Sequence, residues 1–304
     1  MTRIAEQLDI LEQTPLIEMQ GQVLEVRGLA CRVGGISVPV GAMVRIETRD
    51  PLLGEVVGFD KDEVLVMPFG ATGGIKRGDI VTLIQLAQTV PVGDNMLGRV
   101  VNALGQPIDE KGPINGVGPR SLYPKVVDPM DRPLIDEPLG TGVRVVDAMT
   151  TLGCGQRIGV FAPPGVGKST ILGMMARGTS ADVIVVGLVG ERGREVQDFV
   201  QKQLGKEGLK RAVVVVATGD ESPLLRIRAA QAATTVAEFF RDQGKNVLFM
   251  MDSVTRFAMA QREIGLAAGE PPTTKGYPPS MFALLPRLVE RTGRTPKGSI
   301  TAFY

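Results

Sequence analysis

Residues 158–169 read Ile-Gly-Val-Phe-Ala-Pro-Pro-Gly-Val-Gly-Lys-Ser. The opening Ile-Gly-Val-Phe is typical of a buried strand, and the residues from Lys168 onward favour a helix. Gly165 and Gly167 let the backbone curl, so that successive N–H groups point inward at a bound anion. The helix that starts at Lys168 turns its positive end to the same place. This strand, loop and helix together predict a phosphate-binding loop.

Lys168 and Ser169 carry the charge and the hydroxyl that such a loop needs. Lys168 is expected to reach the β and γ phosphates of a nucleoside triphosphate, and Ser169 to ligate Mg²⁺. The loop fits the known GxxxxGK[ST] pattern with Ala162 in the place of the first glycine. A glycine-rich turn without a ligand is the competing interpretation. The residues expected to bind the nucleotide are Pro163, Pro164, Gly165, Val166, Gly167, Lys168, Ser169 and Thr170.

Two carboxylates follow other apolar runs. Asp252 comes after the run 247–251, and Glu191 follows the run 182–189. Because parallel strands end at one edge of a sheet, we expect three adjacent strand ends to bring both acids to the phosphate-binding loop. Asp252 is expected to order Mg²⁺ through water, and Glu191 to orient the water that attacks the γ phosphate. A helix-capping role for Asp252 and a solvated surface position for Glu191 are the alternatives.

The residues that follow Glu191 are also charged. Arg192 is expected to contact the γ phosphate, and it joins Lys168 and the two acids as a predicted catalytic residue. Arg194 and Glu195 begin the next helix. We expect them to have structural or intersubunit roles.

The character of the chain changes along its 304 residues. Short strand-like runs separated by Gly, Pro and Asp predict a small β-barrel over residues 19–90. Residues 91–140 are rich in Gly and Pro and are expected to form a connecting and edge region of the fold. The predicted strands after residue 142 are 157–161, 182–188, 212–217, 246–251 and 299–303, and the predicted helices are 168–177, 194–204, 223–241, 253–267 and 280–291. This alternation predicts an α/β nucleotide-binding domain over residues 91–304, with a parallel sheet between helices.

Residues 1–18 form a separate amphipathic segment, in which Ile4, Leu8 and Leu11 have helical spacing. The segment either packs on its own domain or docks on a partner. The N-terminus lacks the apolar core of a signal peptide, and the apolar runs are shorter than the roughly 20 residues that span a bilayer. A cytoplasmic protein is therefore expected.

Composition narrows the chemistry. The net charge is +1, from 34 basic and 33 acidic residues, so no electrostatic attraction to nucleic acid is expected. Histidine is absent, which excludes histidine bases, histidine metal ligands and a Ser-His-Asp triad. Cys31 and Cys154 lie outside any CxxC pattern and favour neither a disulfide framework nor a zinc site.

Several longer motifs resemble one family. The stretches Gly-Glu-Arg-Gly-Arg-Glu (190–195), Met-Asp-Ser-Val-Thr-Arg-Phe-Ala (251–258), Gly-Glu-Pro-Pro (269–272) and Gly-Ser-Ile-Thr-Ala-Phe-Tyr (298–304) are similar to the ATPases of flagellar and type III secretion export. These enzymes are relatives of the catalytic subunits of rotary ATP synthases. The resemblance extends from about residue 20 to the last residue, and a flagellar member is favoured. It implies a RecA-like nucleotide domain behind the β-barrel and ATP hydrolysis that energises protein export.

The resemblance also implies partners and a location. The implied assembly is a homohexameric ring. The implied partners are a central stalk protein, a regulator bound through the N-terminal segment, the export gate, and export substrates with their chaperones. The expected place is cytoplasmic, at the cytoplasmic face of the export apparatus, with at most peripheral membrane contact and no nucleic acid. The loop 269–279, with Lys275 and Tyr277, matches the family's segment that lines the pore near the stalk.

By the same resemblance, the chain stops inside a core strand. The arginine finger, the aromatic residues around adenine and the helical C-terminal domain of the family lie beyond residue 304. A finger can contribute about 10³ to 10⁵ in turnover. We therefore expect the 304-residue chain to hydrolyse ATP poorly and to assemble poorly.

Two other functions stay open on the sequence. A RecA-like hexameric nucleic-acid motor is disfavoured by the neutral charge and by a barrel poor in aromatic residues. A non-catalytic nucleotide-binding subunit of a rotary ring is disfavoured by Glu191, because such subunits typically lack this glutamate. Neither the Asn-Lys-x-Asp motif of GTPases nor the Leu-Ser-Gly-Gly-Gln signature of ABC proteins occurs.

Overall fold

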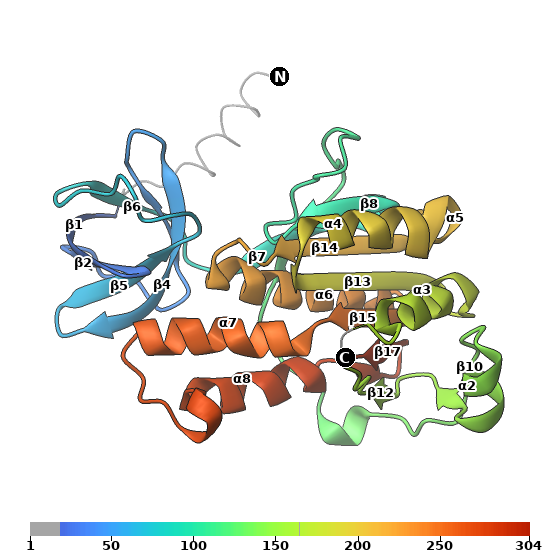
Figure 1. Ribbon diagram of the computed structural model, residues 1–304. Helices are drawn as coiled ribbons and strands as arrows, with labels where there is room; N and C mark the ends of the chain where they lie inside the picture. The colour runs from blue at the N-terminus through green and yellow to red at the C-terminus, as the bar shows by residue number, and fades with distance from the viewer. Residues whose placement is uncertain (1–18, 164) are drawn as a thin grey trace, which may run out of the picture. The chain divides into compact units, whose positions relative to one another are not determined.

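The computed structural model of the chain describes residues 19–163 and 165–304. The chain divides into two compact units, Met1–Ala87 and Gln88–Tyr304 (Figure 1). The amphipathic segment expected over residues 1–18 lies outside the described residues.

The first unit is a closed β-barrel, which confirms the prediction from its short strand-like runs. Its antiparallel strands are β1 (Gln20–Arg27), β2 (Ala30–Gly34), β3 (Met43–Ile46), β4 (Leu52–Asp60), β5 (Glu63–Pro68) and β6 (Ile80–Gln85). Around the barrel they follow the order β1-β2-β5-β4-β3-β6. Alternate residues of a strand point to the same side, so one set of side chains fills the interior. The fully buried valines of this core are Val23, Val33, Val44, Val56, Val66 and Val81.

A parallel sheet forms the middle of the second unit, as the alternation of strands and helices predicts. Its strands lie in the order β12 (Arg157–Ile158), β17 (Ser299–Phe303), β15 (Asn246–Asp252), β13 (Val183–Glu191), β14 (Ala212–Thr218) and β8 (Arg99–Asn102). Each neighbouring pair in this order is parallel, and the short β16 (Gly293–Arg294) adds an antiparallel partner to β17. Strand β8 at the edge comes from the Gly- and Pro-rich region, which confirms its expected edge role.

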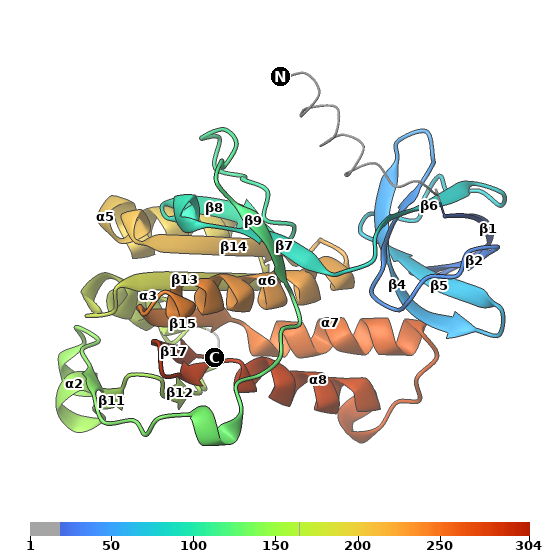
Figure 2. The same cartoon turned by 180° about the vertical axis from the view of Figure 1, so that it is seen from behind.

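Helices cover both faces of this sheet. They are α2 (Arg144–Met149), α3 (Lys168–Gly178), α4 (Gly193–Asp198), a π-helical turn η3 (Phe199–Leu204), α5 (Gly205–Lys210), α6 (Pro223–Asp242), α7 (Val254–Ala267) and α8 (Pro279–Glu290). On β13, Ile184 and Val186 share a core with Leu172 of α3. Gly187 has the opposite phase in the alternation of β13 and faces α6, where an added Cβ would lie 3.1 Å from the Ala233 side chain. Helix α3 and helix α6 accordingly lie on opposite faces of the sheet (Figures 1 and 2).

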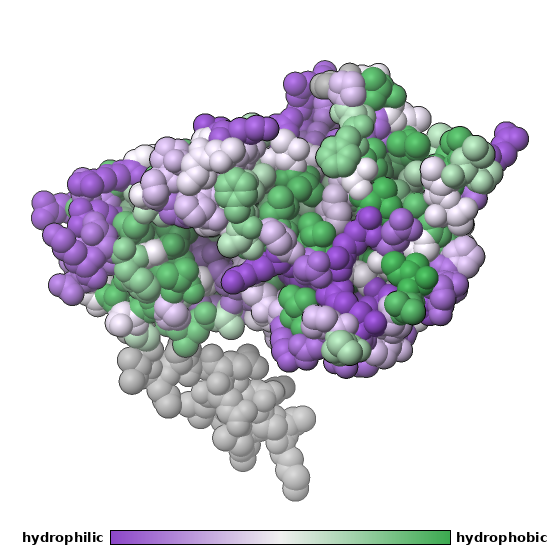
Figure 3. Space-filling view, turned by 90° about the horizontal axis from the view of Figure 1, so that it is seen from below, coloured by the Kyte–Doolittle hydropathy of each residue, from purple (hydrophilic) through white to green (hydrophobic). Residues whose placement is uncertain are grey.

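Shorter elements complete the second unit. Strand β7 (Thr89–Val92) pairs with β9 (Gly118–Ser121), and β10 (Pro138–Leu139) pairs with β11 (Leu152–Gly153). The 3-10 turns are η1 (Asp94–Met96), η2 (Pro129–Asp131) and η4 (Thr274–Gly276). Among the described helices, none combines the length and the apolar character that crossing a bilayer requires. Figure 3 shows hydrophilic and apolar side chains interspersed on one face of the molecule.

The expectation of three adjacent strand ends is wrong. Strand β17 lies between β12, which leads into the phosphate-binding loop, and β15, which ends at Asp252. Only the two acid-bearing strands, β13 and β15, are neighbours. The alternation of strands and helices predicts their order along the chain, but it does not determine their order across the sheet.

Local boundaries also differ from the expectations. Strand β12 ends at Ile158 rather than at residue 161, although the Val160 N–H still donates to the Tyr304 carbonyl at 2.7 Å. The helix expected over 194–204 widens into the π-helical turn from Phe199.

Candidate active site

The phosphate-binding loop connects β12 to α3. Gly165 has φ +85° and Gly167 has φ +94°, the left-handed region that side chains disfavour. A Cβ added at either glycine would meet nothing within 4 Å, so the requirement for glycine is conformational rather than spatial. Gly167 is also the N-cap of α3, and its carbonyl accepts from the Ile171 N–H at 3.0 Å. The loop therefore leads directly into a helix whose first residue is Lys168.

The predicted loop residues differ in their surroundings. Lys168 and Ala162 line a cavity of about 310 Å³. Ser169 lines a second cavity, of about 200 Å³. The other described loop residues are exposed: Pro163, Gly165, Val166, Gly167 and Thr170. Pro164 lies outside the described residues.

Lys168 and Asp252 form the central ion pair of the site. The Lys168 Nζ lies 2.6 Å from Oδ1 of Asp252, with the lysine side chain 31% exposed and the aspartate side chain 9% exposed. Asp252 is the last residue of β15 and lines both cavities. A buried carboxylate needs such a partner, because removal from water is costly unless the charge is paired. The helix-cap role falls to Ser253, whose hydroxyl accepts from the Arg256 N–H of α7 at 3.4 Å.

Glu191 ends the neighbouring strand β13 and lines the second cavity with Ser169 and Asp252. Burial raises the pKa of the Glu191 carboxyl to about 7, and a hydrogen bond with Glu195 and the negative charge of Asp252 add to the rise. The positive charge of Arg256 opposes it. Glu191 is therefore no solvated surface acid. A carboxyl group that titrates near neutral pH is suited to accept a proton from water.

The second cavity holds residues that the sequence analysis did not assign to the site. Its lining is Ser169, Leu188, Glu191, Glu195, Asp198, Phe199, Gln203 and Asp252. Glu195 was expected to be structural or intersubunit, yet its side chain faces this cavity. Asp198 follows three residues later on α4, a spacing that places both acids on one helix face and could have revealed Asp198. Gln203 depends on the π-helical turn, for which the sequence carries no clear signal.

Arg192 is not brought to the same place. Its side chain is 68% exposed and lies 3.7 Å from the Glu195 carboxylate. It is absent from the lining of both cavities. Contact between Arg192 and a γ phosphate stays a prediction.

The donor set fits Mg²⁺ held largely through water. The polar side chains around the second cavity offer hydroxyl, carboxylate and amide oxygens, which are hard ligands. Over residues 19–163 and 165–304, no cluster of three or more acidic, histidine or cysteine side chains is close enough to hold a metal ion directly. Mg²⁺ in nucleotide sites typically binds one or two protein side chains, phosphate oxygens and several waters.

The loop that the resemblance assigns to the pore forms a compact turn between α7 and α8. Thr273 closes it, since its hydroxyl donates to the Tyr277 carbonyl at 2.6 Å. The guanidinium of Arg262 lies 5.9 Å from the centre of the Tyr277 ring. Lys275 is exposed at the tip with φ +55°. Its role at a pore stays a prediction.

Family models match both units of the chain. Residues 142–304 match the nucleotide-binding domain of the ATP synthase alpha/beta family, and residues 17–83 match the β-barrel domain of the same family. The flagellum-specific ATP synthase of Bacillus subtilis is 51% identical over 301 residues, which cover 98% of this chain and 69% of the relative. The type 3 secretion system ATPase of Xanthomonas euvesicatoria is 50% identical over 312 residues, covering 97% of this chain and 71% of the relative.

A solved structure shares the fold. The assembled ATPase EscN of the enteropathogenic E. coli type III secretion system superposes with a TM-score of 0.89 at 46% identity, over 93% of this chain and 69% of EscN. A second structure, EscN in complex with its central stalk EscO, gives a TM-score of 0.88. The fold and these similarities agree. The chain belongs to the ATP synthase alpha/beta family, among its flagellum-specific and type 3 secretion system ATPases.

Proposed function

We propose that the protein hydrolyses ATP with Mg²⁺ to energise protein export through a flagellar-type or type III secretion apparatus. One observation carries the chemical part of this proposal: Lys168, Asp252, Ser169 and Glu191 meet around two cavities that share Asp252. The export part rests on the relatives, which are named a flagellum-specific ATP synthase and a type 3 secretion system ATPase.

The roles of the side chains follow from their charges. In the structure, Asp252 satisfies the Lys168 ammonium at 2.6 Å. We infer that a bound triphosphate would draw this ammonium onto its β and γ oxygens, which would free the Asp252 carboxylate to face a cation. Ser169 and Asp252 are the residues that would hold Mg²⁺, which would neutralise charge on the phosphate oxygens. Glu191 takes the proton of the attacking water, with Arg192 as a further phosphate contact.

The wider assembly is also proposed from the relatives. EscN was solved as an assembled ATPase and with its central stalk EscO. By analogy, this protein forms a homohexameric ring around a stalk, to which the loop with Lys275 and Tyr277 is turned. A regulator bound through residues 1–18, the export gate, and substrates with chaperones complete the proposed partners. The proposed location is the cytoplasmic face of the export apparatus, with peripheral membrane contact.

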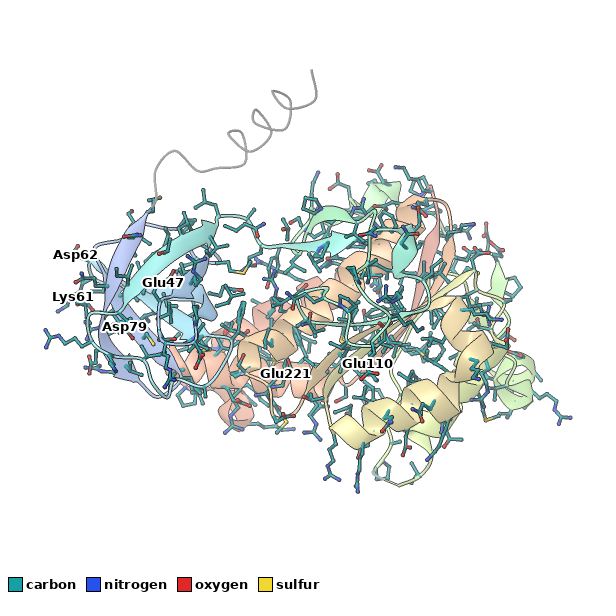
Figure 4. All side chains as sticks on the ribbon, turned by 90° about the horizontal axis from the view of Figure 1, so that it is seen from above. Glu47, Lys61, Asp62, Asp79, Glu110 and Glu221 are labelled. Carbon is teal, nitrogen blue, oxygen red and sulfur yellow. The ribbon has the colours of Figure 1, made fainter. Side chains whose placement is uncertain are left out.

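A nucleic-acid motor has less support. Glu47, Asp62 and Asp79 lie on the barrel together with Lys61 (Figure 4), so acidic and basic side chains are mixed there, whereas grooves for single strands are positively charged. The presence of Glu191 at the site also argues against a non-catalytic subunit.

A paired binding and turnover experiment tests the proposal. Lys168→Ala should lose nucleotide binding and turnover together. Glu191→Gln should bind a nucleotide normally and fail to release phosphate. Normal turnover by the glutamine variant would remove Glu191 as the base, and normal nucleotide affinity of Lys168→Ala would refute the site itself.

A further inference from the structure

The helix that follows the Glu191 strand widens beside the nucleotide site. Helix α4 passes into the π-helical turn η3 (Phe199–Leu204), which stops at Gly205 with φ +66°. π-helical turns inside α-helices are uncommon and frequently occur at functional sites. Here the turn places Phe199 and Gln203 on the wall of the 200 Å³ cavity that Ser169 and Glu191 also line.

A glycine on α3 makes room for Gln203. A Cβ added to Gly173 would lie 2.6 Å from both Cβ and Oε1 of Gln203, closer than real contacts allow. Gly173 lies four residues after Ser169, so the two residues share one face of α3. The Gln203 carboxamide therefore lies against the helix face that presents the Ser169 hydroxyl. Arg177, one turn further along α3, donates to the Gln203 carbonyl and fixes the turn on this helix.

The carboxamide differs in chemistry from the rest of the cavity wall. Four carboxylates line the cavity, at Glu191, Glu195, Asp198 and Asp252. Among the described residues of this lining, Gln203 alone carries an amide, which offers two N–H donors and one oxygen acceptor. Within the described part of the chain, the carboxamide makes no hydrogen bond. The half-buried Gln203 carboxamide is thus available to hydrogen-bond the Ser169 hydroxyl and the carboxylates of this cavity.

We propose that Gln203 is a positioning residue of the nucleotide site, which orients the Ser169 hydroxyl and the adjacent carboxylates toward a bound divalent cation. The inference rests on the proposed function. The π-helical turn supplies the position, Gly173 supplies the space, and the carboxamide supplies the hydrogen bonds. Because the ligand shell of Mg²⁺ demands near-ideal geometry, loss of this orientation weakens the Mg²⁺-dependent part of nucleotide affinity.

The test compares affinity for a non-hydrolysable ATP analogue with excess Mg²⁺ and with a chelator. Gln203→Ala and Gln203→Met should weaken binding in Mg²⁺ by roughly fivefold, the effect of one net hydrogen bond, and leave binding in chelator unchanged. Methionine keeps the length and apolar stem of the side chain but removes the amide. Gly173→Ala should show the same loss, since the added methyl group displaces Gln203. Gln201→Ala, an exposed glutamine of the same turn outside the cavity lining, is the matched control and should change neither affinity.

Three results would overturn the inference. Gln203→Met could bind as the unchanged protein does, which would make the role one of packing. The affinity with Mg²⁺ and the affinity with chelator could both fall along with the melting temperature, which would make the role of Gln203 structural. Binding in Mg²⁺ could also stay unchanged in all variants. Lys168→Ala separates this from the proposed function, because failure of that variant to lose nucleotide binding would refute the site irrespective of Gln203.

Discussion

Asp252, at the end of β15, lies beside a positively charged side chain, whereas Glu191, at the end of the neighbouring β13, lies beside two acidic ones. Asp252 lies 2.6 Å from the Lys168 ammonium. Burial raises the pKa of Glu191 to about 7, and a hydrogen bond with Glu195 and the negative charge of Asp252 add to the rise. Parallel strands thus deliver two acids to one edge, and their neighbours give them different chemistry. We propose that Asp252 serves a cation and that Glu191 exchanges a proton near neutral pH.

The largest effect on turnover is expected when the proton acceptor, Glu191, is removed. In Glu191→Gln, the amide cannot accept a proton, so turnover should fall by roughly 10² to 10⁴. Nucleotide affinity should remain, because Lys168 and the glycine loop are untouched. Phosphate release and equilibrium binding measure the two properties separately. A variant that loses affinity to the same extent as turnover would show that Glu191 contributes to binding instead.

Removal of the positive partner affects the other strand end. Lys168→Ala should weaken nucleotide binding by roughly 10- to 100-fold, since a charge-assisted contact to phosphate is lost. Asp252 would then be buried without its partner, so the nucleotide-free protein should also unfold more easily. Lys168→Ala combined with Asp252→Asn should regain part of that stability, but no affinity. Equal melting temperatures of the single and double variants would contradict the pairing.

The pH dependence of stability sharpens the contrast. Burial raises the pKa of Glu191 from 4.5 to about 7, so folding favours its protonated form. The stabilisation of the folded state by the protonated Glu191 carboxyl is fully present below the ordinary carboxyl pKa and is lost as pH rises through about 7. Glu191→Gln cannot ionise, so its stability advantage over the unchanged protein should grow between about pH 5 and about pH 8. Urea unfolding of the nucleotide-free proteins measures this, and a constant difference over that range would contradict the raised pKa.

Arg192 should give the smallest effect on the free protein. Its side chain is 68% exposed and its ion pair with Glu195 spans 3.7 Å, so Arg192→Ala should change the free energy of unfolding by less than about 0.5 kcal/mol. Turnover should nevertheless fall if the guanidinium reaches the γ phosphate after nucleotide binds. Unchanged turnover would remove Arg192 from the catalytic residues.

Much of the site could be predicted because its chemistry is local in the sequence. Gly165, Gly167 and Lys168 lie within one loop, and Glu191 and Asp252 each follow an apolar strand. These patterns depend on backbone conformation and on strand direction, which short stretches encode. The barrel could be predicted for the same reason, through its short strand-like runs separated by Gly, Pro and Asp.

The remaining features depend on contacts between distant segments. Strand β17 separates β12 from β15, an order decided by packing across the whole sheet. Glu195 reaches the cavity because α4 starts immediately after β13, whereas its sequence position suited a structural role equally well. Gln203 faces the site only because the helix widens at Phe199 and Gly173 leaves space on α3. Local sequence patterns do not encode side-chain environments of this kind.

A structure with a bound non-hydrolysable ATP analogue and Mg²⁺ tests the central claim most directly. The account predicts that the Lys168 ammonium leaves Asp252 and lies about 3 Å from phosphate oxygens, with Ser169 and Asp252 on the cation side and Glu191 one water away from the γ phosphate. A triphosphate bound with Glu191 turned to another face of the sheet, or with the Lys168–Asp252 pair intact, would contradict it.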